Sequence, residues 1–142
     1  MFKKLNNLKK DKKGFTLVEL IVVLVILAIL MAVLIPALLG WIDKARNSQV
    51  TTNANAALVA AQGLADEYYG TTTSSITAAK AKSYVKASKI DELADITESF
   101  SISATFGSGS GHDVCVIKKF VYTSESGKTA TWEIDTGTWE VN

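Results

Sequence analysis

An unbroken run of apolar residues dominates the N-terminal third of this chain of 142 residues. Every one of the twenty residues from Leu20 to Leu39 is apolar, Pro36 included. A helix at the surface of a soluble domain needs only one apolar stripe, so a helix that is apolar on all sides must lie in protein or lipid. At 1.5 Å per residue the run would span about 30 Å, which is the thickness of bilayer hydrocarbon. It therefore predicts a membrane-spanning segment at residues 20–39.

Charge is divided unevenly along the chain. Residues 1–14 contain six lysines and one aspartate, whereas the rest of the chain contains nine basic and thirteen acidic side chains. A basic segment before an apolar span follows the positive-inside rule, which predicts a cytoplasmic N-terminus and an external C-terminal part. A nucleic-acid interpretation of these lysines is weaker, because they are few, local and without aromatic neighbours. The sequence leaves nucleic-acid binding undecided.

A periodic pattern after the apolar run predicts that the helix continues to residue 69. Small and apolar residues recur there at spacings of three and four, which places them on one helical face. They are Val50, Ala54, Ala57, Ala61, Leu64 and Tyr68. The face expected to lie opposite is polar, with Asn47, Thr51, Asn55, Gln62 and Asp66. Gly70 supplies a helix stop, so one long helix is expected over residues 15–69.

The C-terminal third of the chain has the alternating pattern of β-strands. Strand signals separated by glycine-containing turns predict an antiparallel meander of three or four strands. They lie at residues 100–106, 114–123, 130–135 and 139–141. Residues 70–99 are expected to connect helix and sheet, with short helices at 77–87 and 90–96. The predicted fold is α+β, with residues 1–14 as a leader and the second half of the long helix packed on a sheet within residues 100–142.

The junction between leader and apolar run differs from an ordinary secretory signal. Its small residue, Gly14, precedes the apolar stretch, and no Ala-x-Ala-like site follows at a suitable distance. Cleavage after Gly14 would remove the lysines and leave the apolar helix on the processed chain. Glu19 has two interpretations: a carboxylate at headgroup level favoured by the helix N-terminus, or a partner for a cation inside an apolar interface. Cleavage would create such a cation on Phe15.

The segment Lys13-Gly14-Phe15-Thr16-Leu17-Val18-Glu19, followed by the apolar run, resembles the class III signal of type IV pilins and pseudopilins. The resemblance is strong from residue 9 to about residue 45 and architectural beyond it. It implies that a prepilin peptidase cleaves between Gly14 and Phe15 and N-methylates Phe15. It also implies that Glu19 neutralises a neighbouring subunit's N-terminus and that Pro36 marks a bend or local melting of the helix, although a simple kink fits Pro36 equally well.

The resemblance further implies a life cycle for the chain. Before assembly, lipid surrounds the helix of a single-pass protein in the plasma membrane. After assembly with copies of itself, by an assembly platform and an ATPase motor, the helix lies in the core of an extracellular filament. The chain has no Walker-type phosphate loop of its own. With one cysteine it cannot close the disulfide loop of many pilins, which makes it more similar to pilins of Gram-positive bacteria.

The sequence is also compatible with several other functions. The nearest is a pseudopilin of a type II secretion or DNA-uptake machine. A membrane-anchored binding module could use the loops 71–75 and 107–111, and a membrane enzyme would have to use His112 with Cys115. Cys115 is more simply interpreted as a buried core residue, and His112 as a loop residue. No cofactor or metal is expected, since Asp113 and Asp135 alone make a weak calcium site.

Overall fold

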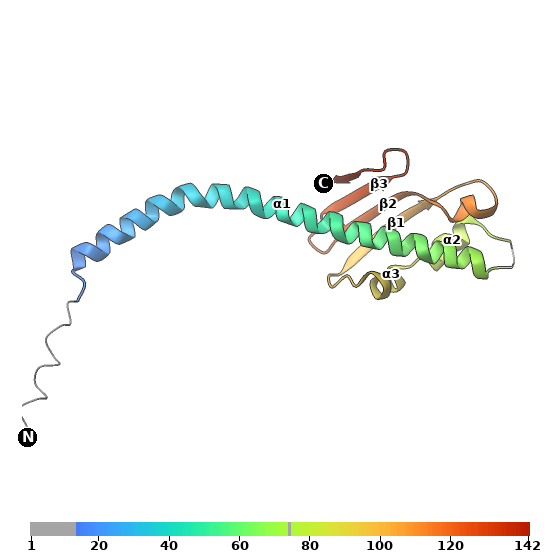
Figure 1. Ribbon diagram of the computed structural model, residues 1–142, viewed down its shortest axis with the longest axis horizontal. Coiled ribbons are helices and arrows are strands. Elements are labelled where there is room, and N and C mark those ends of the chain that lie inside the picture. The colour runs from blue at the N-terminus through green and yellow to red at the C-terminus, as the bar shows by residue number, and fades with distance from the viewer. Residues whose placement is uncertain (1–13, 74) are drawn as a thin grey trace, which may run out of the picture. The chain divides into compact units, whose positions relative to one another are not determined.

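The computed structural model describes residues 14–73 and 75–142, and the chain divides into a first unit that ends at Ile42 and a second unit, Asp43–Asn142. The predictions for the basic leader therefore concern residues that lie, apart from Gly14, outside the described part of the chain. The observed elements are one long helix, two short helices and a four-stranded sheet (Figure 1). This confirms the predicted α+β class.

Helix α1 runs from Leu17 to Thr71 and starts and ends two residues later than predicted. Thr16 is its N-terminal cap, because its hydroxyl oxygen accepts a hydrogen bond from the backbone N–H of Glu19 at 3.2 Å. Its carbonyl accepts the first helical hydrogen bond, from the N–H of Leu20, at 3.2 Å. Pro36 lies inside the helix, where it has no N–H to donate to the carbonyl of Ala32.

The predicted small-residue stripe of α1 is the part of the helix that is buried in the second unit. Five of its six predicted members are buried, Tyr68 is partly buried, and Ala65 joins them. The buried stripe consists of Val50, Ala54, Ala57, Ala61, Leu64 and Ala65. Alanine side chains let a helix approach its neighbours closely, and the core that the stripe shares is completed by the fully buried Phe120 and Tyr122. Burial of this core holds the second unit together.

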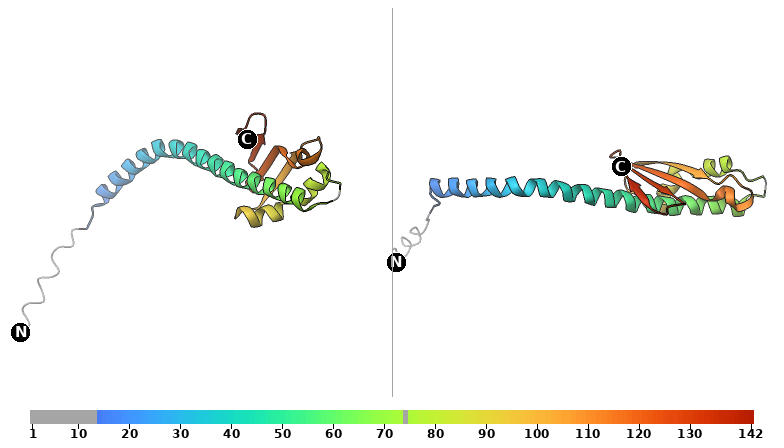
Figure 2. Two further views of the ribbon diagram at one scale, coloured as in Figure 1. Left: turned by 45° about the vertical axis from the view of Figure 1, so that its right-hand side comes forward. Right: turned by 90° about the horizontal axis from the view of Figure 1, so that it is seen from above.

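The sheet is an antiparallel meander with the strand order β1-β2-β3-β4 (Figure 2). Its strands are β1 Phe100–Phe106, β2 Ile117–Ser124, β3 Thr129–Glu133 and β4 Trp139–Val141. The prediction that a strand begins at residue 114 is wrong. Gly111–Cys115 forms a 3-10 helix, η1, in which Val114 and Cys115 are buried. A short apolar run does not distinguish a strand from a buried turn, which explains the error.

Two short helices connect α1 to the sheet, close to the predicted positions. Helix α2 is Ala78–Tyr84, capped by the Thr77 side chain, which accepts a hydrogen bond from the N–H of Lys80 at 3.4 Å. Helix α3 is Ala87–Ala94 and ends at Asp95 in the left-handed conformation. Both helices contact β1. They therefore cover the β1 edge of the sheet, whereas β4 forms the other edge.

Candidate functional site

The bond between Gly14 and Phe15 precedes the first helical residue, Leu17, and lies in non-helical backbone. Gly14 has no atom within 4 Å of the place where a side chain would begin. The Phe15 side chain is 79 % exposed. Within the described residues, the backbone at this bond is therefore neither helical nor covered by side chains.

Glu19 lies in the first turn of α1 and is exposed. A carboxylate is favoured there because the unpaired N–H groups of the first turn give the helix N-terminus a partial positive charge. Among the described residues no basic side chain forms an ion pair with it. The structure thus brings Phe15, Thr16 and Glu19 together at the start of the helix.

The cap formed by Thr16 is a site feature that the sequence reasoning missed. Thr16 and Glu19 have the S/T-x-x-E spacing of a capping box, in which a threonine precedes a helix and a glutamate follows three residues later. That spacing was visible in the sequence. It fixes where the helix starts, and therefore how far the Glu19 backbone lies from the Gly14–Phe15 bond.

The apolar part of α1 is uncovered within the described chain. No residue from Leu20 to Leu39 is buried. By length and composition this helix can cross a membrane, and the most apolar part of it is 0 % buried. An apolar surface of this extent is not stable in water, so lipid or another protein must cover it. Trp41, 72 % exposed, follows the run, as aromatic residues do at the level of lipid headgroups.

Comparison with known proteins identifies the junction. The prokaryotic N-terminal methylation motif matches residues 9–35. This motif is the class III signal peptide of type IV pilins, so the predicted signal is confirmed. No curated protein and no solved structure matches the chain.

The motif and the long apolar helix together support a type IV pilin-like protein, in which pilins and pseudopilins are both included. They also support the attachment of the chain to a membrane by a single helix. The motif is found in structural proteins rather than enzymes.

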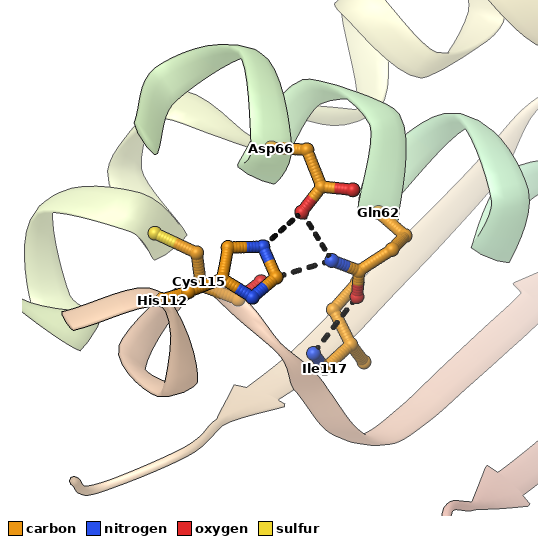
Figure 3. Close-up of polar contacts among 5 residues, drawn as sticks. All are labelled: Gln62, Asp66, His112, Cys115 and Ile117. Atoms are coloured by element: carbon orange, nitrogen blue, oxygen red, sulfur yellow. Dashed lines mark hydrogen bonds and ion pairs between the residues drawn. The ribbon is translucent and has the colours of Figure 1, made fainter. Parts of the chain in front are cut away.

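A polar clamp connects α1 with the segment that leads into β2 (Figure 3). The amide of Gln62 accepts a hydrogen bond from the N–H of Ile117 at 3.0 Å and donates to the carbonyl of Cys115 at 3.2 Å and to Asp66 at 2.8 Å. Asp66 in turn contacts His112 Nε2 at 2.9 Å. The expectation that Gln62 and Asp66 lie on a face opposite to the packed one is therefore wrong, because polar side chains at the border of the stripe satisfy backbone groups of the second unit.

His112 and Cys115 do not form a nucleophile–base pair. The imidazole of His112 is engaged by Asp66 and packs edge-on against Tyr69, with ring centroids 5.0 Å apart. Cys115 is buried, as the sequence indicates, and burial raises the pKa of its thiol. A raised pKa disfavours the reactive thiolate. In this geometry Cys115 is a core residue, and His112 contacts Asp66 and Tyr69.

Asp113 organises the glycine-rich loop that was considered as a binding surface. Its carboxylate accepts a hydrogen bond from the N–H of Gly109 at 2.9 Å and pairs with Lys118 at 3.1 Å. A side chain at Gly107 would meet the backbone of Asp113, so glycine is required there by close approach. The other candidate loop, 71–75, includes residue 74, which lies outside the described residues. Within the described chain no three His, Cys, Asp or Glu residues are grouped as metal ligands.

Proposed function

We propose that the chain is a structural subunit of a type IV pilus filament, held in the plasma membrane before assembly. One observation carries the proposal: the methylation motif at residues 9–35 includes the start of a long helix whose apolar residues are not buried within the described chain. A membrane anchor alone needs no such motif. The motif adds a processing step that frees the helix from its charged leader.

Processing is proposed at Gly14 and Phe15. Hydrolysis of the bond between them by a prepilin peptidase releases the leader with its six lysines and gives Phe15 a free α-amino group. The same enzyme then N-methylates that amine. The exposed, non-helical backbone at this bond supports the assignment.

Assembly is proposed to depend on Glu19. In a filament core built from the segments Leu20–Leu39, the amine of Phe15 would lie in an apolar environment, where an unpaired charge is strongly unfavourable. The Glu19 carboxylate of the same or a neighbouring subunit would neutralise it. In the second case the pair would also fix the axial register between subunits. Pro36 is assigned as the point where the helix bends or locally melts on assembly.

The same helix is surrounded by lipid in the membrane and by neighbouring helices in the filament core. During extrusion the side chains of Leu20–Leu39 exchange lipid for neighbouring helices. The driving energy comes from an ATPase motor acting through an assembly platform. The N-terminus is assigned to the cytoplasm by the basic leader, and the lack of a second cysteine supports a Gram-positive host.

N-terminal sequencing and intact-mass measurement of protein sheared from cells test this proposal. The expected product begins at a methylated Phe15. An intact Met1, or cleavage near Gly40, would overturn it. The pseudopilin alternative shares the motif, and abundance separates the two: a major pilin dominates sheared surface material, whereas a pseudopilin is scarce.

A further inference from the structure

A row of directly paired residues crosses the sheet, one from each strand. It consists of Ala104 in β1, Phe120 in β2, Trp132 in β3 and Trp139 in β4. Directly paired residues lie on the same face of a sheet, and Phe120 belongs to the core that contains the alanine stripe of α1. Burial decreases along the row: Ala104 and Phe120 are buried, whereas Trp132 and Trp139 are only partly buried.

The width of a single helix explains this decrease. A helix with its side chains is about 10–12 Å across and strands lie about 4.8 Å apart, so one helix covers only two or three strands. Helices α2 and α3 contact β1, and neither contacts β3 or β4. Figure 1 shows α3 and β3 on opposite sides of α1. The two tryptophans of the row therefore lie beside α1, on the side of the sheet that the short helices do not cover.

A shallow hollow of about 530 Å³ lies between α1 and Trp139. Its other lining residues are Ser48, Thr51, Thr52 and Asn55, which follow one another at spacings of three, one and three and therefore share one face of the helix. These four side chains are polar, and no side chain that lines the hollow is ionisable. The hollow thus combines one indole ring with four neutral polar groups.

The polar side chains of the hollow retain hydrogen-bonding capacity. Thr51 and Thr52 donate their hydroxyl protons to the carbonyls of Asn47 and Ser48, each at 2.9 Å. Their hydroxyl oxygens are still available as acceptors. The side chains of Ser48 and Asn55 form no hydrogen bond within the described residues, and each can both donate and accept.

This combination of groups is suited to a neutral sugar. A hexopyranose has hydroxyls around its edge, each of which donates and accepts, and its C–H groups can stack on an aromatic ring, whose face is electronegative. A nucleotide would also stack, but its phosphates require basic groups, which the lining lacks. A purely apolar ligand would remove the polar groups from water without pairing them, which is unfavourable.

We propose that this hollow, between Trp139 and residues 48–55 of α1, binds a hexopyranose unit of a glycan. Trp139 provides the stacking surface, the oxygens of Thr51 and Thr52 accept from sugar hydroxyls, and Ser48 and Asn55 donate and accept. One sugar unit makes few contacts, so its binding is weak. The site lies within the second unit of a single chain and does not depend on the proposed filament function.

Nuclear magnetic resonance of the isotope-labelled full chain tests the site. The chain is held in micelles of dodecylphosphocholine, whose headgroup contains no sugar, and its three tryptophans give indole N–H signals that Trp→Phe variants assign. The probes are methyl α-glucoside and methyl α-galactoside, which represent neutral hexoses, and N-acetylglucosamine, which represents amino-sugar glycans. At least one probe should move the Trp139 signal saturably and leave the Trp41 signal in place. No saturable shift with any probe, or equal shifts of both signals, would overturn the proposal.

Two matched controls identify the groups that bind. Sorbitol carries similar hydroxyls on an open chain without a ring to stack, so it should not move the Trp139 signal, and an equal shift with sorbitol would contradict the stacking. Asn55→Ala should raise the dissociation constant of the sugar about threefold or more, the effect of one lost hydrogen bond. Gln49→Ala removes an exposed amide that lies on the same helix outside the hollow, and it should have no effect. Equal dissociation constants for these two variants would overturn the assignment of Asn55.

The yield of sheared filaments separates a sugar site from a contact between copies of the chain. Asn55→Ala should leave this yield unchanged, because the hollow is assigned to a ligand and not to a neighbouring subunit. A loss of filaments from this variant, without a sugar-dependent shift in the wild-type chain, would assign the hollow to an interface and overturn the proposal. If the wild-type chain forms no filaments, the proposed function fails, and the sugar titration still decides this inference.

Discussion

The backbone N–H of Glu19 donates a hydrogen bond to the hydroxyl oxygen of Thr16 at 3.2 Å, so the residue whose carboxylate is assigned to assembly also provides the N–H that the helix cap satisfies. The two roles use different atoms of Glu19. Substitutions can therefore separate the charge of residue 19 from the cap of residue 16.

Glu19→Ala removes the charge and leaves the cap. We expect a chain that is cleaved, inserted and folded but that does not assemble efficiently, because the amine of Phe15 would enter an apolar core unpaired. Fractionation should find the processed chain in membranes and not in sheared filaments. Glu19→Asp, with the charge one methylene closer to the backbone, should be partly active. Filaments of wild-type yield and length from Glu19→Ala would exclude the charge-pair mechanism.

Thr16→Val removes the cap and leaves the charge. Loss of a threonine cap costs about 0.5–2 kcal/mol, which acts on the first turn of α1 alone. We expect reduced assembly with unchanged membrane insertion. Thr16→Ser retains the hydroxyl and should restore assembly, and quantitative blotting of sheared material compares the two. Equal yields from the valine and serine variants would show that the cap has no part in assembly.

Gly14→Leu should block processing, because a bulky side chain replaces hydrogen at the residue before the cleaved bond. The leader lysines would stay attached, and charged side chains do not readily enter an apolar core or cross a bilayer. Mass spectrometry of membranes should find the uncleaved chain, with no sheared filaments. Normal filaments from this variant would place the cleaved bond elsewhere.

Gln62→Ala should destabilise the second unit. The variant leaves the N–H of the buried Ile117 without its acceptor, which costs about 1–3 kcal/mol. Tryptophan fluorescence of the full chain in detergent measures the thermal midpoint. The matched control is Asn55→Ala on the same helix, an exposed residue without such contacts, which should not lower the midpoint, because alanine is the better helix former. Equal midpoints for the two variants would show that the clamp is not stabilising.

The contribution of Asp113 to the stability of the folded chain, through the loop at residues 107–111, should decrease in acid. Its contact with Lys118, and then the N–H of Gly109, lower the pKa of its carboxyl below the ordinary value. A lowered pKa in the folded chain means a contribution to stability that is present above about pH 4 and lost as the pH falls through the folded pKa. The midpoint difference between wild type and Asp113→Asn should therefore be largest near about pH 6 and shrink near about pH 3. A difference independent of pH would contradict this assignment.

The elements that could be predicted from the sequence are those in which one physical requirement applies to many consecutive or regularly spaced residues. Continuous apolarity from Leu20 to Leu39 specified the exposed helix, and the three-four spacing from Val50 to Leu64 specified the buried stripe, because each pattern repeats over several turns. The 3-10 helix at Gly111–Cys115 was missed, since its five residues are too few to display a period. The clamp of Gln62 on Ile117 was missed for another reason: it joins residues 55 positions apart, and no local pattern reports such a contact.

The continuity of α1 has a mechanical consequence. One uninterrupted helical segment, Leu17–Thr71, supplies both the apolar surface assigned to anchoring and the alanine stripe at the centre of the second unit's core. Within one subunit, a pulling force would therefore pass from the anchoring segment along covalent backbone into that core. Unfolding of a subunit under tension would then depend on how well the core packs around α1, and substitutions that weaken the buried stripe would lower the force at which the subunit unfolds.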